Sequence, residues 1–344
     1  MAATVPRMIR ESNQPDFHVF AELKGRIQKA GLLEKNLIYS IYKLIQALGL
    51  MALAATALAL TERLWLQVLE AVFLALASTQ MGFIAHDTGH RQLFRKGRSN
   101  DILGLLLVNG LLGFSYGWWV EKHNRHHANP NHLDHDPDIH FPILAFSAEQ
   151  AVSRPARLRF FVKHQAAFFL PVLFLLAISL RVDSVKFIRG ARWRYHRTEI
   201  LLLLAHAVLY LGLLTHALGP WRGLLVAAVH QVCFGIFLGL VFAVNHIGMP
   251  LVEPGVRLEF VYHQVVTSRN LKRHPVTDWL YGPLVCQIEH HLFPAMSRNS
   301  LRKAEEIVKK FCSERSIPYH ESGVFASYRE LLVHLHTVSA PLRA

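Results

Sequence analysis

The sequence predicts an all-α integral membrane protein, and three observations lead to that prediction. Of the 344 residues, 52% are hydrophobic, and the mean hydropathy is +0.24. The apolar residues gather in runs such as 44–60, 201–218 and 224–244, each close to the roughly 20 residues that cross a bilayer core. The chain also holds 22 histidines, many of them clustered just beyond apolar runs. We expect about four transmembrane helices in two hairpins, half-inserted or interfacial helices, and a cytosolic helical cap.

The four predicted spans follow a polar lead-in, residues 1–36. A short polar break, Thr61-Glu62-Arg63, separates the first two spans, and Gly219-Pro220 separates the last two. Two further apolar segments, 102–119 and 160–180, are interrupted by glycines or by a proline, which favours half-inserted or interfacial helices over full crossings. The predicted spans are 41–60, 64–84, 200–218 and 221–244, and the cytosolic cap comprises 85–198 and 245–344.

The charge balance predicts the orientation of these spans. The chain carries 37 Lys and Arg against 24 Asp and Glu, a net charge of +13. Segments 85–100 and 181–198 are rich in Lys and Arg, so both should face the cytosol, and parity then places 245–344 there as well. The basic residues flank apolar spans and form no helix suited to reading a nucleic acid. We therefore expect membrane lipid, and no nucleic acid, among the partners.

Three short histidine clusters follow the spans or lie in the cap. Within each cluster the spacing is i, i+4 or i, i+3, i+4, which places side chains on one face of a helix and lets imidazoles converge on one ion. In the third cluster a glutamine takes the place of the first histidine. The clusters are His86 and His90; His123, His126 and His127; and Gln287, His290 and His291.

This residue set predicts a dinuclear metal site for oxidation. Imidazole suits Fe, Zn, Cu and Ni, and seven histidines exceed what one ion can use. Breaking an unactivated C–H bond needs an oxidant that no side chain supplies, so a metal site at a membrane face suits O2 chemistry on an apolar substrate. A two-zinc hydrolase would usually add bridging carboxylates, and only Asp87 lies in the first cluster. A metal transporter would place its ligands inside the spans.

The motifs HDTGH, HNRHH and QIEHHLFP resemble the three histidine boxes of membrane fatty-acid desaturases, over roughly His86 to Arg298. The third resembles the front-end type, which inserts a double bond between existing unsaturation and the carboxyl end. The resemblance implies that 37–344 is a desaturase domain with two non-haem irons in the cap. The implied ligands are His86, His90, His123, His126, His127, His246, His290 and His291. Gln287, Asn245, Asp87 and Asp136 are expected as further ligands or as neighbours that orient imidazoles.

The resemblance also implies the reaction and its partners. The expected reaction is O2-dependent insertion of a cis double bond into a fatty-acyl chain, as acyl-CoA or acyl-lipid, with no catalytic residue apart from the metal site. No His-Pro-Gly-Gly haem motif of a fused cytochrome b5 domain is present. Electrons are therefore expected from a separate carrier, a ferredoxin or a cytochrome b5 with its reductase. The active site should face the cytosol from a bacterial inner membrane or the endoplasmic reticulum.

The sequence does not exclude several other functions. The same scaffold supports hydroxylation or a related oxidation of an acyl or other lipid, because both reactions begin by removing a hydrogen atom. A metal transporter, a haem-binding membrane protein and a zinc hydrolase are more distant alternatives. Desaturation is favoured over hydroxylation by the resemblance of QIEHH alone.

Overall fold

The computed structural model describes residues 17–190 and 193–343, and nearly all of the regular structure in them is helical. Residues 1–16 of the predicted lead-in and residues 191–192 of the basic segment 181–198 lie outside the described part. The chain divides into two compact units. We call residues 35–121 and 171–240 the span unit, and residues 17–34, 122–170 and 241–343 the histidine unit.

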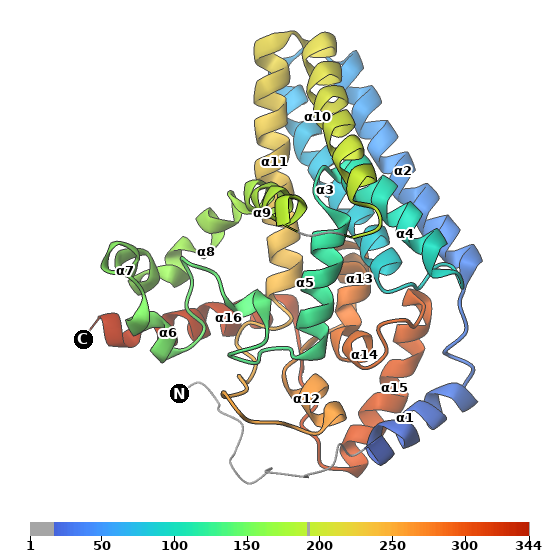
Figure 1. Cartoon of the computed structure of the whole chain (residues 1–344), viewed down its shortest axis with the longest axis vertical. Helices are drawn as coiled ribbons and strands as arrows, with labels where there is room; N and C mark the ends of the chain where they lie inside the picture. The colour runs from blue at the N-terminus through green and yellow to red at the C-terminus, as the bar shows by residue number, and fades with distance from the viewer. Residues whose placement is uncertain (1–16, 191–192, 344) are drawn as a thin grey trace. The chain divides into compact units, whose positions relative to one another are not determined.

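Among the described residues, four helices are long and apolar enough to cross a membrane, or up to six spans if each of two bent helix pairs is one span, and this confirms the predicted all-α membrane class. The four long helices form two hairpins (Figure 1). On α10 the residues Leu204 and Val208 are 61% and 71% exposed, as expected of side chains that face lipid. The four helices are α2 (Leu37–Leu60), α3 (Leu64–Gly89), α10 (His196–Leu218) and α11 (Pro220–Ala243).

Polar groups and a glycine close the two hairpins at the predicted breaks. Between α2 and α3, the Gln67 side chain donates a 2.6 Å hydrogen bond to the Thr61 carbonyl, and the Thr61 hydroxyl donates to Glu70. Between α10 and α11, Gly219 has φ +82°, a conformation that glycine adopts without steric cost. Pro220 then starts α11, where its missing N–H is not needed.

The two interrupted apolar segments are sharply bent. Helix α4 (Gly97–Leu105) continues as a π-helical turn, Leu106–Leu112, and meets α5 (Tyr116–Ala128) at 112°. At the bend Gly113 has φ +74°, and a Cβ there would lie 2.3 Å from the His206 ring, so only glycine fits. Helices α8 (Gln165–Leu173) and α9 (Leu176–Gly190) meet at 70°. Since α9 reaches Gly190, most of the basic segment 181–198 is helix.

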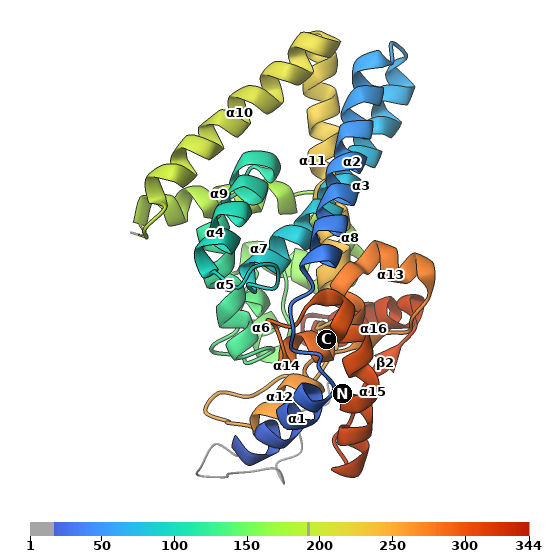
Figure 2. The ribbon, with the colours of Figure 1, turned by 90° about the vertical axis from the view of Figure 1, so that its right-hand side faces the viewer.

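The histidine unit is built around one large apolar core. Helices α1 (Phe17–Lys29), α12 (Phe260–Val266), α14 (Gln287–Leu292) and α15 (Arg298–Glu314) pack together (Figure 2). Leu23 and Ile27 of α1 share this core with Ile288 of α14 and Phe311 of α15. The helix of the lead-in therefore supports the helix that carries the third histidine cluster.

The remaining elements of the histidine unit are short. Strands β1 (Asn270–Leu271) and β2 (Glu321–Ser322) pair in parallel, with Asn270 opposite Glu321. The helices are α6 (Ala148–Ser153), α7 (Ala156–Lys163), α13 (Pro275–Tyr281) and α16 (Val324–Val338), with 3₁₀ turns at Pro137–Ile139, Gly282–Cys286 and Ala340–Leu342.

Candidate metal centre

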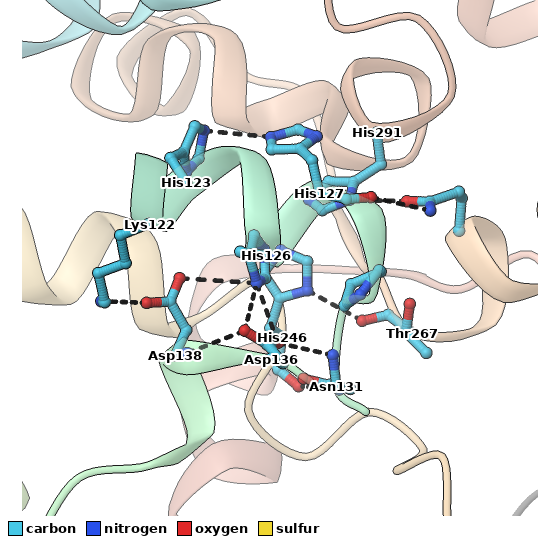
Figure 3. Close-up of polar contacts among 12 residues, drawn as sticks. Lys122, His123, His126, His127, Asn131, Asp136, Asp138, His246, Thr267 and His291 are labelled. Carbon is cyan, nitrogen blue, oxygen red and sulfur yellow. Dashed lines mark hydrogen bonds and ion pairs between the residues drawn. The ribbon is translucent and has the colours of Figure 1, made fainter. Parts of the chain in front are cut away.

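Three imidazoles from distant parts of the sequence meet inside the histidine unit (Figure 3). His126 comes from α5, His246 from the turn after α11, and His291 from α14. One nitrogen of each lies within 4.8 Å of the others. His126 and His291 are 3% and 1% exposed. This arrangement could hold one metal ion.

Each of these rings is held at its Nδ1 atom by an acceptor. A hydrogen bond at Nδ1 fixes the tautomer and the ring orientation, which leaves the Nε2 lone pair for a metal. Asp136 is the strongest of these acceptors because both oxygens of its carboxylate lie within hydrogen-bond distance of His126 Nδ1. The three pairs are His126 with Asp136 at 2.9 and 3.0 Å, His246 with the Thr267 carbonyl at 3.0 Å, and His291 with Gln264 Oε1 at 2.9 Å.

The electrostatics of the site suit a metal. Burial lowers the pKa of His246 to about 3, and burial followed by the neighbouring imidazoles lowers the pKa of His291 well below its ordinary value. Both rings are therefore neutral at physiological pH, and a metal binds neutral imidazole. The Nε2 atom of His291 is buried and makes no hydrogen bond among the described residues. A buried nitrogen of this kind needs a partner, and a metal ion would provide one.

A second group of three imidazoles lies in the same unit. Nitrogens of His123, His127 and His290 lie within 4.8 Å of one another, and the Nε2 atoms of His123 and His127 are 3.1 Å apart. The His127 ring stacks on the His291 ring with centroids 4.1 Å apart, so the two groups are adjacent. The histidine unit thus gathers six of the eight histidines predicted as ligands.

The other two predicted ligands, His86 and His90, lie together in the span unit. His86 is in the last turn of α3 and His90 follows as its C-cap. Their ring centroids are 4.7 Å apart, as the i, i+4 spacing predicts. The side chain of Asp87 lies 3.7 Å from His86 Nδ1, and the Trp119 ring lies 5.7 Å from the His86 ring.

Gln287 contacts the three-imidazole group directly. Its Nε2 atom lies 2.9 Å from Nε2 of His246, the nitrogen that the Thr267 bond leaves for a metal. Its Oε1 atom is buried and makes no hydrogen bond among the described residues. Glu289, by contrast, makes its hydrogen bonds outside the group of imidazoles, where it accepts from Asn270 and Tyr319.

Two expected neighbours of the imidazoles differ in what they bind. Asp136 bonds His126, and it also accepts from the backbone N–H groups of Asn131 and Asp138. Asn245 makes no hydrogen bond to an imidazole among the described residues. Its amide donates to the carbonyls of Arg269 and Leu284, because the turn carrying His246 faces these backbone groups. The structure therefore gives Asn245 a role in the backbone of that turn.

Several residues that shape the site had no signal in the sequence. Gln264 and Thr267 orient His291 and His246, and Asp138 lies 3.5 Å from His126. Arg269 is fully buried, and its guanidinium donates to the carbonyl that follows His246 in the chain, that of Ile247. None of these belongs to a histidine cluster, and their proximity arises only when distant segments fold together.

The fold and the site together indicate an all-α membrane protein whose histidine unit encloses a histidine-rich site suited to metal. Residues 63–323 match the family model described as "Fatty acid desaturase". The chain belongs to the fatty acid desaturase family, whose members are enzymes of lipid metabolism.

Curated relatives match along most of the chain. The chain is 31% identical over 338 residues to an acyl-lipid (9-3)-desaturase of Physcomitrium patens, covering 93% of this chain and 62% of that protein. It is 30% identical over 351 residues to a Delta(6)-fatty-acid desaturase of Caenorhabditis elegans, covering 94% and 76%. It is 29% identical over 316 residues to a Delta(8)-fatty-acid desaturase of Euglena gracilis, covering 87% and 74%.

Proposed function

We propose that this protein catalyses O2-dependent insertion of a cis double bond into a fatty-acyl chain at a dinuclear non-haem iron centre. The observation that carries the proposal is the group of His126, His246 and His291, in which each imidazole is oriented through Nδ1. The names of the relatives support an acyl substrate, with acyl-lipid favoured over acyl-CoA by the moss protein. The Delta(6) and Delta(8) names and the QIEHH motif support insertion on the carboxyl side of existing unsaturation.

The proposed ligands fall into two sets. His126, His246 and His291 would hold one ion, with Gln287 beside it. His123, His127 and His290 would contribute to the second. We assign His86 and His90 to this second ion from the sequence, because they end the second span on the face that parity makes cytosolic.

The protein's own contribution is to position and shield the reacting groups. Asp136, Gln264 and the Thr267 carbonyl hold the imidazoles so that their lone pairs face inward. Burial of the His126 and His291 rings excludes bulk water from them, and desolvation keeps the partly buried His246 and the buried His291 neutral. Bound iron would supply the oxidising power that side chains lack. Overall, the acyl chain loses two hydrogens, O2 becomes two waters, and a carrier supplies two electrons with two protons from solvent.

The partners of this reaction are also part of the proposal. The substrate would reach the site from the membrane, and electrons would come from a separate ferredoxin or a cytochrome b5 with its reductase. The site would face the cytosol from a bacterial inner membrane or the endoplasmic reticulum. The six clustered histidines lie outside α2, α3, α10 and α11, which supports an enzyme over a transporter with ligands inside its spans.

The test is expression in a host that lacks polyunsaturated lipids, supplied with defined acyl chains and followed by lipid profiling. We expect new double bonds that disappear in His291→Ala and persist in His336→Ala, a matched change at an exposed position on α16. Hydroxylated lipids as the only products would overturn desaturation but retain the site. A purified protein that contains zinc, lacks iron and is inactive with O2 would overturn the proposal.

A further inference from the structure

The proposed reaction needs two electrons from outside the substrate, so a carrier must dock close to the metal site. We propose that an acidic one-electron carrier protein docks on a basic surface of the histidine unit, formed by Lys272, Arg273, Arg302 and Lys303. We call these four residues the basic surface. This inference rests on the proposed function and adds to it the place where reducing equivalents enter.

The basic surface joins two elements that are distant in sequence. Lys272 and Arg273 are exposed in the segment after β1, and Arg302 and Lys303 are exposed in the first half of α15. Both arginines converge on one carboxylate, that of Asp278, at 3.9 Å from Arg273 Nε and 3.0 Å from Arg302 Nη2. The two guanidinium groups are thereby held in place while their side chains stay 43% and 42% exposed.

An excess of positive charge remains after this pairing. Asp278 pairs with two of the four basic side chains and is itself only 13% exposed. The exposed Glu306, one turn along α15, offsets one further charge, and Lys272 and Lys303 make no ion pair in the described structure. A surface of this sign attracts an acidic partner and speeds its encounter. Val276, at the start of α13, is 57% exposed beside these charges.

The basic surface lies over the helix that carries the third histidine cluster. Leu301 and Ala304, the core-facing neighbours of Arg302 and Lys303 on α15, pack with Ile288 of α14 in one core. Arg273 and Arg302 are also near enough to the buried Cys286 thiol to oppose the rise in its pKa that burial causes. Cys286 directly precedes Gln287 and shares that core, so the packing of α15 against α14 connects the basic surface to the third histidine cluster.

The arrangement favours a protein over a lipid headgroup as the occupant. On α16, Arg329 is exposed within an apolar stripe of Phe325, Leu332 and Val333, a pattern that suits a membrane interface. The basic surface differs because Val276 is its only large exposed apolar side chain among the described residues of 270–306. A small, mainly charged face of this kind is typical of transient electron-transfer complexes.

The decisive variant is Lys272→Glu with Lys303→Glu, which breaks none of the side-chain bonds described above. The assay measures desaturation in nanodiscs with a reduced acidic carrier, either a ferredoxin or the soluble domain of a cytochrome b5. We expect the KM for the carrier to rise about tenfold, while kcat at saturating carrier stays within about twofold. Turnover driven by dithionite with methyl viologen should not change, because small reductants need no docking.

The control is Arg157→Glu with Arg257→Glu, which changes net charge equally at exposed positions of the histidine unit. It should leave the KM for the carrier near the wild-type value. An equal rise in both doubles, or no rise in either, would overturn the docking surface. A rise seen in phosphatidylglycerol nanodiscs and absent in phosphatidylcholine nanodiscs would assign the surface to lipid instead. Wild-type protein inactive even with the chemical reductant would overturn the proposed function itself.

Discussion

At the residue scale, the orientation of each buried imidazole depends on what it binds at Nδ1. For His126 that acceptor is Asp136, which is fully buried and also accepts two backbone N–H groups. A carboxylate behind a ligating imidazole fixes its tautomer and raises its basicity, and its loss typically lowers metal affinity 10–100-fold. Asp136 therefore belongs to the site although it need not touch the ion.

Asp136→Asn tests this role with little change in shape. We expect iron affinity to fall by about 10–100-fold, measured as iron retained after dialysis against graded chelator concentrations. Asp134→Asn is the control, since it makes the same change at an exposed position two residues away. Full iron retention by Asp136→Asn would show that the His126 tautomer is set by something else.

A second effect at the residue scale concerns Glu289. Burial raises the pKa of its carboxyl group to about 7. This pKa is higher in the folded protein than in the unfolded chain, so protonated Glu289 favours the folded state. Its contribution to the free energy of unfolding is fully present below about pH 4.5 and is lost as pH rises through 7. In Glu289→Gln this pH dependence should vanish, a relative change of up to about 3 kcal/mol. The measurement is the difference in unfolding midpoint between wild type and variant at pH 5.5 and pH 8. A constant difference would contradict the prediction.

At the scale of elements, a buried carboxylate anchors the start of α5, the helix that carries the second histidine cluster. Glu199, in the first turn of α10, is fully buried. Its Oε1 accepts hydrogen bonds from the Asn109 amide, the Ser115 hydroxyl and the Gly117 N–H at 2.8–3.1 Å, and its Oε2 accepts from the Trp193 indole at 2.9 Å. These bonds tie the bend after the π-helical turn to a transmembrane helix.

Glu199→Gln should therefore destabilise the span unit. All partners of Glu199 are hydrogen-bond donors, so the NH2 group of the glutamine would face another donor. A buried polar group left without a hydrogen bond lowers the free energy of unfolding by about 1–3 kcal/mol. We expect a lower thermal unfolding midpoint in detergent, by about 2–4 °C per kcal/mol. The control, Glu62→Gln, changes an exposed acid between α2 and α3 and should be neutral. Equal midpoints for both variants would exclude the anchor.

The sequence predicts the transmembrane helices well and the structure of the basic segments less well. The four spans have long apolar runs with polar or glycine breaks, so their bounds agree within a few residues with α2, α3, α10 and α11. For the segment 181–198 the sequence predicts only a basic stretch that faces the cytosol, and α9 extends into it as far as Gly190. Charge indicates exposure to water, and an exposed helix satisfies that as well as a loop does.

At the scale of the whole molecule, the orientation in the bilayer follows from the basic segments. If they face the cytosol, the breaks at Glu62 and Gly219–Trp221 lie on the opposite side. In a background without Cys233, Cys286 and Cys312, a membrane-impermeant maleimide should label Glu62→Cys and Trp221→Cys on intact cells. It should label Lys310→Cys only after permeabilisation. The reverse pattern would place the histidine-rich site on the outer face.

The amino-acid sequence is sufficient to predict the all-α membrane class, four apolar spans and the three histidine clusters. Apolar run length and helical spacing are local properties, so they can be read along the chain. The groups that orient those histidines become visible once the chain is folded: Asp136 for His126, the Thr267 carbonyl for His246, and Gln264 for His291. The reason is physical, because a hydrogen bond between segments far apart in sequence depends on how helices pack, and no local pattern encodes that partner.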